Sequence, residues 1–202
     1  MQLEAVVRRL ELEQLYTDYV HCLDADELER WPDFFTDDCF YRITSAENYE
    51  AGMPLGLIHA TSRNMLKDRV SALREANIYE PQRYRHLVSS IKIGEELGET
   101  LDLVANFIVV RTMQEGDMTL FGAGRYVDQV KHANAMWKFA RKTVVLDSRQ
   151  IDNPALSRLS RTVTARSALP AQPSRVRGGA LMPRSECGFL SLPGHDSDCR
   201  LL

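Results

Sequence analysis

The chain has 202 residues, of which 44 % are apolar and 26 % charged, as in a globular protein of one domain with or without a tail. Its formal charge of −3 is unevenly spread, because residues 1–152 hold 18 basic and 25 acidic side chains whereas residues 153–202 hold seven arginines and three acids. No apolar run reaches the roughly 20 residues of a membrane span, the N-terminus lacks the apolar segment of a signal peptide, and the acidic body argues against a nucleic-acid surface.

The composition predicts two regions. We expect an acidic folded domain over residues 1–152 and a basic tail, rich in Pro, Ser and Arg and disordered over most of its length, over residues 153–202. The four cysteines have unrelated spacings, and no Cys-x-x-Cys, Cys-x-His or His-Glu-x-x-His pattern occurs. We therefore expect no disulfide framework, no local zinc or iron–sulfur site, and a reducing cytoplasm as the compartment.

Apolar residues at three- and four-residue steps predict a helix over residues 2–24. Together they form one apolar stripe, which we expect to pack on the rest of the domain: Leu3, Val6, Val7, Leu10, Tyr16, Tyr19, Val20 and Leu23. Asp26 follows this helix and Glu29 lies three residues further on, the spacing of a capping box that would start a short second helix.

The middle of the domain alternates between short elements. Residues 39–44 are typical of a strand, and residues 45–56 of a loop with Gly52, Pro54 and Gly56 as breakers. A short apolar segment, residues 57–60, follows. Ser62 can then cap a helix that runs to about residue 77.

The second half of the domain consists of successive strands. Long strand patterns cover residues 84–93, 101–113, 118–130 and 136–146, with short turns that favour antiparallel neighbours. Helices followed by such strands predict an α+β fold, in which a strongly curved antiparallel sheet packs the N-terminal helices in its concave face. We expect six aromatic residues to be core or subunit contacts: Trp31, Phe34, Phe35, Phe107, Tyr126 and Trp137.

Several segments carry a resemblance to a known family. They are Trp31-Pro-Asp-Phe-Phe-Thr-Asp-Asp38 and Arg83-Tyr-Arg-His-Leu-Val-Ser89, together with residues 19–26, 72–79, 123–128 and 144–148. In order and spacing, roughly residues 5–152 resemble the small (β) subunit of the aromatic-ring-hydroxylating dioxygenases. The resemblance is greatest to subunits that serve aromatic carboxylates such as terephthalate, anthranilate, salicylate or halobenzoate.

The resemblance implies both a fold and a role. The fold would be cone-shaped, like nuclear transport factor 2 and ketosteroid isomerase, and the assembly a trimer of αβ pairs. The large subunit would hold a Rieske [2Fe–2S] cluster, a mononuclear iron and the substrate pocket, with electrons from NADH delivered through a reductase, a ferredoxin or both. This chain would hold no cofactor and no catalytic residue and would support assembly.

Two arginines are candidates for the subunit interface. Arg83 and Arg85 share one face of their predicted strand, and Tyr84 and His86 share the other. Paired arginines on a sheet face suit bidentate pairing with carboxylates of a partner. The alternative is that they are solvated or form ion pairs within the chain.

A free-standing enzyme with the same fold is the alternative function. Such an isomerase, dehydratase or hydrolase would place an acid/base group in the cone, with Asp24, His86, Tyr16 and Tyr41 as the candidates. Asp24 can also serve as a helix cap. An open cavity with His86 and a carboxylate would favour the enzyme, and a cone filled by Trp and Phe side chains would favour the structural subunit. A small-ligand binding module is a third possibility.

The resemblance ends near residues 152–153. One explanation for the remaining residues is a frameshift or a readthrough past the family's usual stop, since out-of-frame GC-rich genes give Arg-, Ser- and Pro-rich sequence without Lys. The other is a genuine basic tail that binds the acidic body or an anionic partner.

Overall fold

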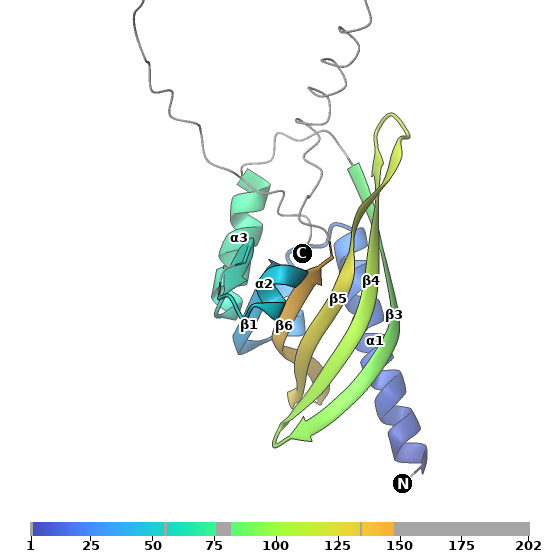
Figure 1. The fold of residues 1–202 in the computed structure, drawn as a ribbon, viewed down its shortest axis with the longest axis vertical. Helices are drawn as coiled ribbons and strands as arrows, with labels where there is room; N and C mark the ends of the chain where they lie inside the picture. Colours follow the sequence, from blue (N-terminus) through green and yellow to red (C-terminus); the bar gives the residue numbers. More distant parts are fainter. Residues whose placement is uncertain (1, 55, 76–81, 134, 148–202) are drawn as a thin grey trace, which may run out of the picture. The chain divides into compact units, whose positions relative to one another are not determined.

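The computed structural model describes residues 2–54, 56–75, 82–133 and 135–147, so the predicted tail at 153–202 lies outside the described residues. Figure 1 shows the elements of the domain in chain order. They are α1 (Gln2–Asp24), the 3₁₀-helix η1 (Trp31–Phe34), β1 (Phe35–Ser45), α2 (Ala46–Glu50), β2 (Ile58–Ala60), α3 (Arg63–Glu75), β3 (Gln82–Leu97), β4 (Thr100–Met113), β5 (Met118–Ala133) and β6 (Met136–Leu146). No helix among the described residues has the length and apolar character needed to cross a membrane.

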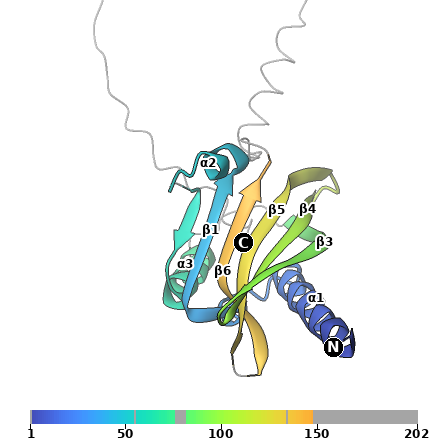
Figure 2. The same cartoon turned by 60° about the horizontal axis from the view of Figure 1, so that its bottom comes forward.

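The six strands form one curved sheet in the order β2-β1-β6-β5-β4-β3 (Figure 2). β3, β4, β5 and β6 are antiparallel neighbours, as the short turns between them predict. The parallel pairing of β1 with β6 was not predicted, because it joins strands far apart in the sequence, with Ile43 opposite Val144. The α+β class and the curved, mainly antiparallel sheet are confirmed.

Aromatic side chains fill the space between the sheet and the helices packed on it. Trp31, Phe35 and Tyr41 are fully buried, and each ring meets the other two edge-on at centroid distances of 5.3–5.8 Å. Phe107 and Tyr126 are also buried, and their rings stack with centroids 4.4 Å apart. Of the six aromatic residues named from the sequence, only Phe34 and Trp137 are half-buried.

The prediction of one apolar stripe along α1 was wrong. Leu12, Tyr16 and Tyr19 are at most 1 % exposed, whereas Leu3 and Leu10 are 76 % and 58 % exposed. At about 100° per residue, the apolar residues of the first three turns point roughly opposite to those of the rest of the helix. The helix therefore has two apolar faces, and only the C-terminal one packs on the sheet.

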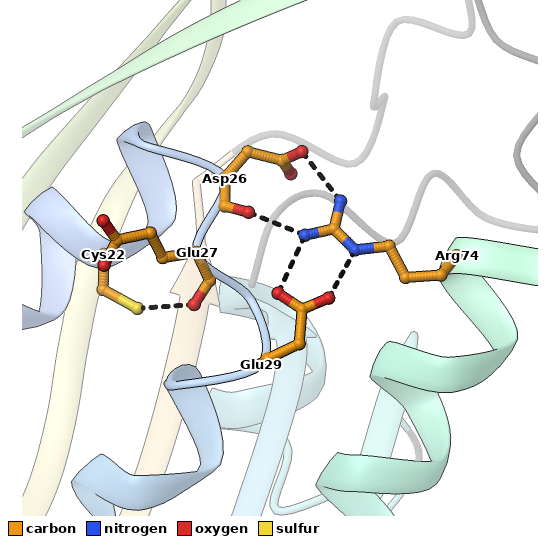
Figure 3. Close-up of polar contacts among 5 residues, drawn as sticks. All are labelled: Cys22, Asp26, Glu27, Glu29 and Arg74. Carbon is orange, nitrogen blue, oxygen red and sulfur yellow. Dashed lines mark hydrogen bonds and ion pairs between the residues drawn. The ribbon is translucent and has the colours of Figure 1, made fainter.

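The capping box at Asp26 and Glu29 was also wrong. Asp26 has a φ of +59°, in the left-handed region, and the 3₁₀-helix that follows begins only at Trp31 with no side-chain cap. Both carboxylates instead bind Arg74 of α3, which donates to Asp26 Oδ2 at 2.7 Å and to Glu29 Oε1 at 2.8 Å (Figure 3). The predicted cap at Ser62 is confirmed, since its Oγ accepts from Met65 N at 3.3 Å.

Candidate functional site

The most unusual chemistry of the domain lies in its interior, where β5, β6 and α1 meet. Asp128 of β5 and Lys142 of β6 are opposite each other in the sheet, and Lys142 Nζ lies 2.8 Å from Asp128 Oδ2. Tyr16 of α1 donates its hydroxyl to the same oxygen at 2.7 Å. Neither charged side chain is exposed at all. We call these three residues the interior triad.

A β-bulge brings the two charges together. The β5–β6 hairpin keeps one register from its turn, where Ala133 lies opposite Met136, to the pair of Val130 and Phe139. The register then shifts by one residue between Val130 and Gln129. Without the shift, Asp128 would lie opposite Arg141, which is exposed. The extra residue therefore turns Lys142 inward and Arg141 outward.

Aromatic rings surround the ammonium group of Lys142. Its Nζ lies 3.7 Å from the ring centroid of Tyr126, 4.3 Å from that of Phe139 and 4.6 Å from that of Tyr19. Such contacts partly replace the hydration that a cation loses on burial. The lysine is therefore held by one carboxylate and several ring faces.

Burial sets the protonation of the interior triad. It raises the pKa of Asp128 despite the opposing effect of Lys142, and it lowers the pKa of Lys142 despite the opposing effect of Asp128. It also raises the pKa of Tyr16 well above its ordinary value, with Asp128 adding to the effect. Burial thus disfavours the charged form of each group, and both are sealed from solvent.

The structure brings Asp24 and His86 together. Asp24 ends α1, and its Oδ1 lies 2.6 Å from Nδ1 of His86 on β3, while both carboxylate oxygens accept the backbone N–H of His86 at 3.2 Å. His86 Nε2 is buried, with no hydrogen-bond partner among the described residues. This pair fastens the end of α1 to the edge strand.

The four candidates of the alternative enzyme lie in three separate environments, of which Asp24 and His86 share one. Tyr16 belongs to the interior triad, and Tyr41 is fully buried against Trp31 and Phe35. Two grooves between α1 and the β5–β6 hairpin, with volumes of about 770 and 400 Å³, are lined by none of the four. The carboxylate–histidine contact that the enzyme would need is present, whereas the interior around the other two candidates is filled by aromatic rings.

Arg83 and Arg85 lie on the outer face of β3, both exposed, and Tyr84 and His86 are buried on the inner face. Leu87 continues the outer face and pairs across the sheet with Ile108 of β4; the two are 56 % and 44 % exposed. The guanidinium of Arg85 is 3.8 Å from Asp24 and remains largely exposed. The edge of the sheet thus presents both arginines beside apolar side chains.

Of the interior triad, only Tyr16 was a candidate from the sequence; Asp128 and Lys142 were missed, although Asp128 lies in one of the segments that carry the family resemblance. Its signal is a charged residue at an inward strand position, between Tyr126 and Val130, both of which are buried. The lysine carried no such signal, because its inward orientation depends on the bulge. Within the described ranges, no group of three or more His, Cys, Asp and Glu side chains is arranged as a metal site.

The comparisons with known proteins agree with one another. The family model for the ring-hydroxylating beta subunit matches residues 19–153. The anthranilate 1,2-dioxygenase small subunit of Burkholderia cepacia is 39 % identical over 141 residues, which are 70 % of this chain and 88 % of the relative. Beta subunit 1 of the terminal oxygenase component of terephthalate 1,2-dioxygenase from Comamonas sp is 35 % identical over 147 residues, which are 73 % and 96 % of the two chains.

A solved structure agrees as well. It is assigned as the beta subunit of an aromatic-ring-hydroxylating dioxygenase of Novosphingobium aromaticivorans and is 32 % identical in sequence. The two structures superpose with a TM-score of 0.68, and the match covers 73 % of this chain and 94 % of the other chain. The family and the nuclear-transport-factor-2-like fold predicted from the sequence are confirmed. The chain belongs to the family of ring-hydroxylating dioxygenase beta subunits.

Proposed function

We propose that this chain is the small subunit of an oxygenase that adds dioxygen to an aromatic carboxylate, and that it supports the assembly of the large subunit. Membership of the family implies a large partner subunit and iron cofactors in that partner. Anthranilate and terephthalate, which the names of the two relatives give, are both aromatic carboxylates.

The observation that carries the supporting role is the filled interior. A binding cavity for an aromatic acid needs a few hundred cubic ångströms of open space with polar groups at its wall. Here Trp31, Phe35 and Tyr41 occupy the inner side of β1, and the interior triad is sealed beneath Tyr19 and Tyr126. The interior formed by the described residues therefore offers an aromatic acid no such space, which supports a substrate pocket in the partner.

The iron centres are proposed to lie in the large subunit because of the ligands that they need. The Rieske [2Fe–2S] centre and the mononuclear iron need His, Cys and carboxylate ligands gathered within a few ångströms. The described residues gather no such set and do not fit either centre. The iron would activate dioxygen, with electrons from NADH reaching it through a reductase, a ferredoxin or both, in a cytoplasmic trimer of αβ pairs.

The contact with the large subunit is proposed to include the outer face of β3. Arg83 and Arg85 present their guanidinium groups there, next to the exposed pair Leu87 and Ile108. A patch that combines arginine with apolar area is typical of protein–protein interfaces. The domain over residues 1–152 would supply this surface, and the tail over 153–202 would not be required.

Reconstitution tests the proposed function. The large subunit of the same organism is expressed with the full chain, with residues 1–153 alone, and without either, and each preparation is assayed for assembly and for dioxygenation of a panel of benzoates. We expect assembled, active oxygenase in the first two cases and poor assembly in the third. A large subunit that assembles and turns over normally alone would sink the supporting role.

A further inference from the structure

The N-terminal half of α1 carries an apolar face that the domain does not cover. Leu3, Val6, Val7 and Leu10 have the i, i+3, i+4, i+7 spacing of one helix face and are 76 %, 54 %, 45 % and 58 % exposed. Single exposed leucines are ordinary, but four on one face over two turns form a contiguous strip. We call these four residues the α1 strip.

A furrow runs along the helix beside this strip. Its first part, about 400 Å³, is lined by Leu3 and Val7 of the strip and by Glu11, and its second part, about 770 Å³, continues from Glu11 toward Arg30. The opposite wall is the β5–β6 hairpin, and His132 and Trp137 of that hairpin line both parts. The α1 strip and the furrow therefore adjoin and form one elongated surface.

The furrow is acidic. Glu11 accepts the indole N–H of Trp137 at 2.9 Å and Asp18 accepts the side-chain amide of Gln14 at 2.7 Å, so the hydrogen bonds of both carboxylates come from neutral donors. Five of the lining residues are acidic, and three are basic: Arg8, Arg30 and Lys138. The two arginines are already engaged, because Arg8 binds Glu96 at 2.9 Å and Arg30 binds Glu27. An occupant that matches this surface carries apolar side chains flanked by basic ones.

A second copy of this chain is a poor match. If two copies packed through both the strip and the furrow, the acidic lining of one furrow, which includes Glu11 and Asp18, would face that of the other copy. Like charges brought together at an interface disfavour that pairing. The charge pattern thus disfavours a second copy packed in this way and favours a basic occupant.

We propose that the α1 strip and the furrow dock an amphipathic, basic segment of the large subunit. This rests on the proposed function, which supplies the partner, and it adds a second contact surface to the outer face of β3. The docked segment would cover the strip with its apolar side chains and place lysine or arginine near Glu11 and Asp18. Such a contact combines apolar burial with a salt-dependent attraction.

The test measures binding of the purified full chain to the purified large subunit. In the variant Val7→Glu/Leu10→Glu two strip residues become charged, and we expect binding at least tenfold weaker. The matched control is Met53→Glu/Leu57→Glu, two residues 49 % and 48 % exposed that line neither part of the furrow, and it should bind like the unmodified chain. All four positions are exposed, so circular dichroism and Tm should be unchanged.

A second variant changes the charge of the furrow and leaves the α1 strip intact. Glu11→Gln/Asp18→Asn should weaken binding at low salt and flatten the dependence of Kd on salt concentration. Hydrogen exchange on the complex should show new protection of amides 5–14. Unchanged binding by both variants would overturn the proposal, as would loss of self-association with unchanged affinity for the large subunit. If the unmodified chain itself fails to bind the large subunit, the proposed function falls; if it binds and the variants bind equally well, only this inference falls.

Discussion

Removing the lysine of the interior triad tests how the domain tolerates a buried charge. In Lys142→Met the side chain keeps its length and loses its ammonium group, while Asp128 keeps only the hydroxyl of Tyr16, at 2.7 Å, on its Oδ2. Both charged side chains are fully buried, so no water can take the place of the lost amine. The variant therefore leaves a carboxylate unpaired in the interior.

The expected size of the effect follows from this geometry. Breaking a fully buried ion pair by removing one partner costs about 3–5 kcal/mol, most of it from the charge left behind. In a domain of this size, each kcal/mol lowers Tm by about 2–4 °C, so the variant should melt roughly 10 °C or more below the unmodified chain. The double variant Lys142→Met/Asp128→Leu should recover most of this lost stability, because no charge remains buried. It should stay about 1 kcal/mol less stable than the unmodified chain, because Tyr16 loses its hydrogen bond to Asp128.

Thermal and urea unfolding of the single and double variants measure these energies as a double-mutant cycle. Lys138→Met on the same strand is the control; Lys138 is half-buried and should change stability by no more than about 0.5 kcal/mol. A Lys142→Met variant that melts within 2–3 °C of the unmodified chain, or a double variant less stable than the single one, would refute the reasoning.

Three further outcomes follow from the same structure. Burial holds the pKa of Asp128 above its ordinary value, so the folded Lys142→Met variant takes up a proton on acidification before the unfolded chain does. The stability deficit of the variant should therefore shrink as pH falls from 7 toward 4. A deficit that grows on acidification would contradict this. Gly124→Ala should abolish soluble expression or lower Tm sharply, because a Cβ there would collide with the backbone oxygen of Val145 in β6; an unchanged Tm would show that the strands can separate. Asp24→Asn should cost about 1–3 kcal/mol in unfolding experiments, because the link to His86 is weakened. It should leave turnover per assembled oxygenase unchanged, and a fall in turnover with normal assembly would contradict a purely supporting role for this pair.

The hairpins β3 to β6 could be predicted because their information is local. Each turn lies between two alternating runs, and residues such as Gly116, with a φ of +93°, mark where the chain reverses. The pairing of β1 with β6 has no local signal, since Phe40 and Arg141 are brought together only when the whole sheet forms. The order of elements was therefore predictable, and the closure of the sheet was not.

The difference between local and tertiary information also explains which site residues could be predicted. Asp24 and His86 were candidates by residue type, and nothing in the sequence joined them, because α1 and β3 meet only through tertiary packing. Lys142 was not a candidate, because most lysines lie at the surface, and only the register shift between Gln129 and Val130 turns it inward. The apolar residues of α1 were counted as one stripe although the step from Leu10 to Tyr16 is six residues. At about 100° per residue that step turns the side chain to another face of the helix, so the spacing itself carried the signal of two faces.

The supporting role is tested most directly by native mass spectrometry of the oxygenase purified through a tag on its large subunit. The full chain is co-expressed without a tag, so that it appears only if it binds. We expect complexes that contain the two subunits in equal numbers, three of each, and no active large subunit without this chain. Large subunit recovered alone in an active assembly, with this chain left in the unbound fraction, would contradict the proposed function.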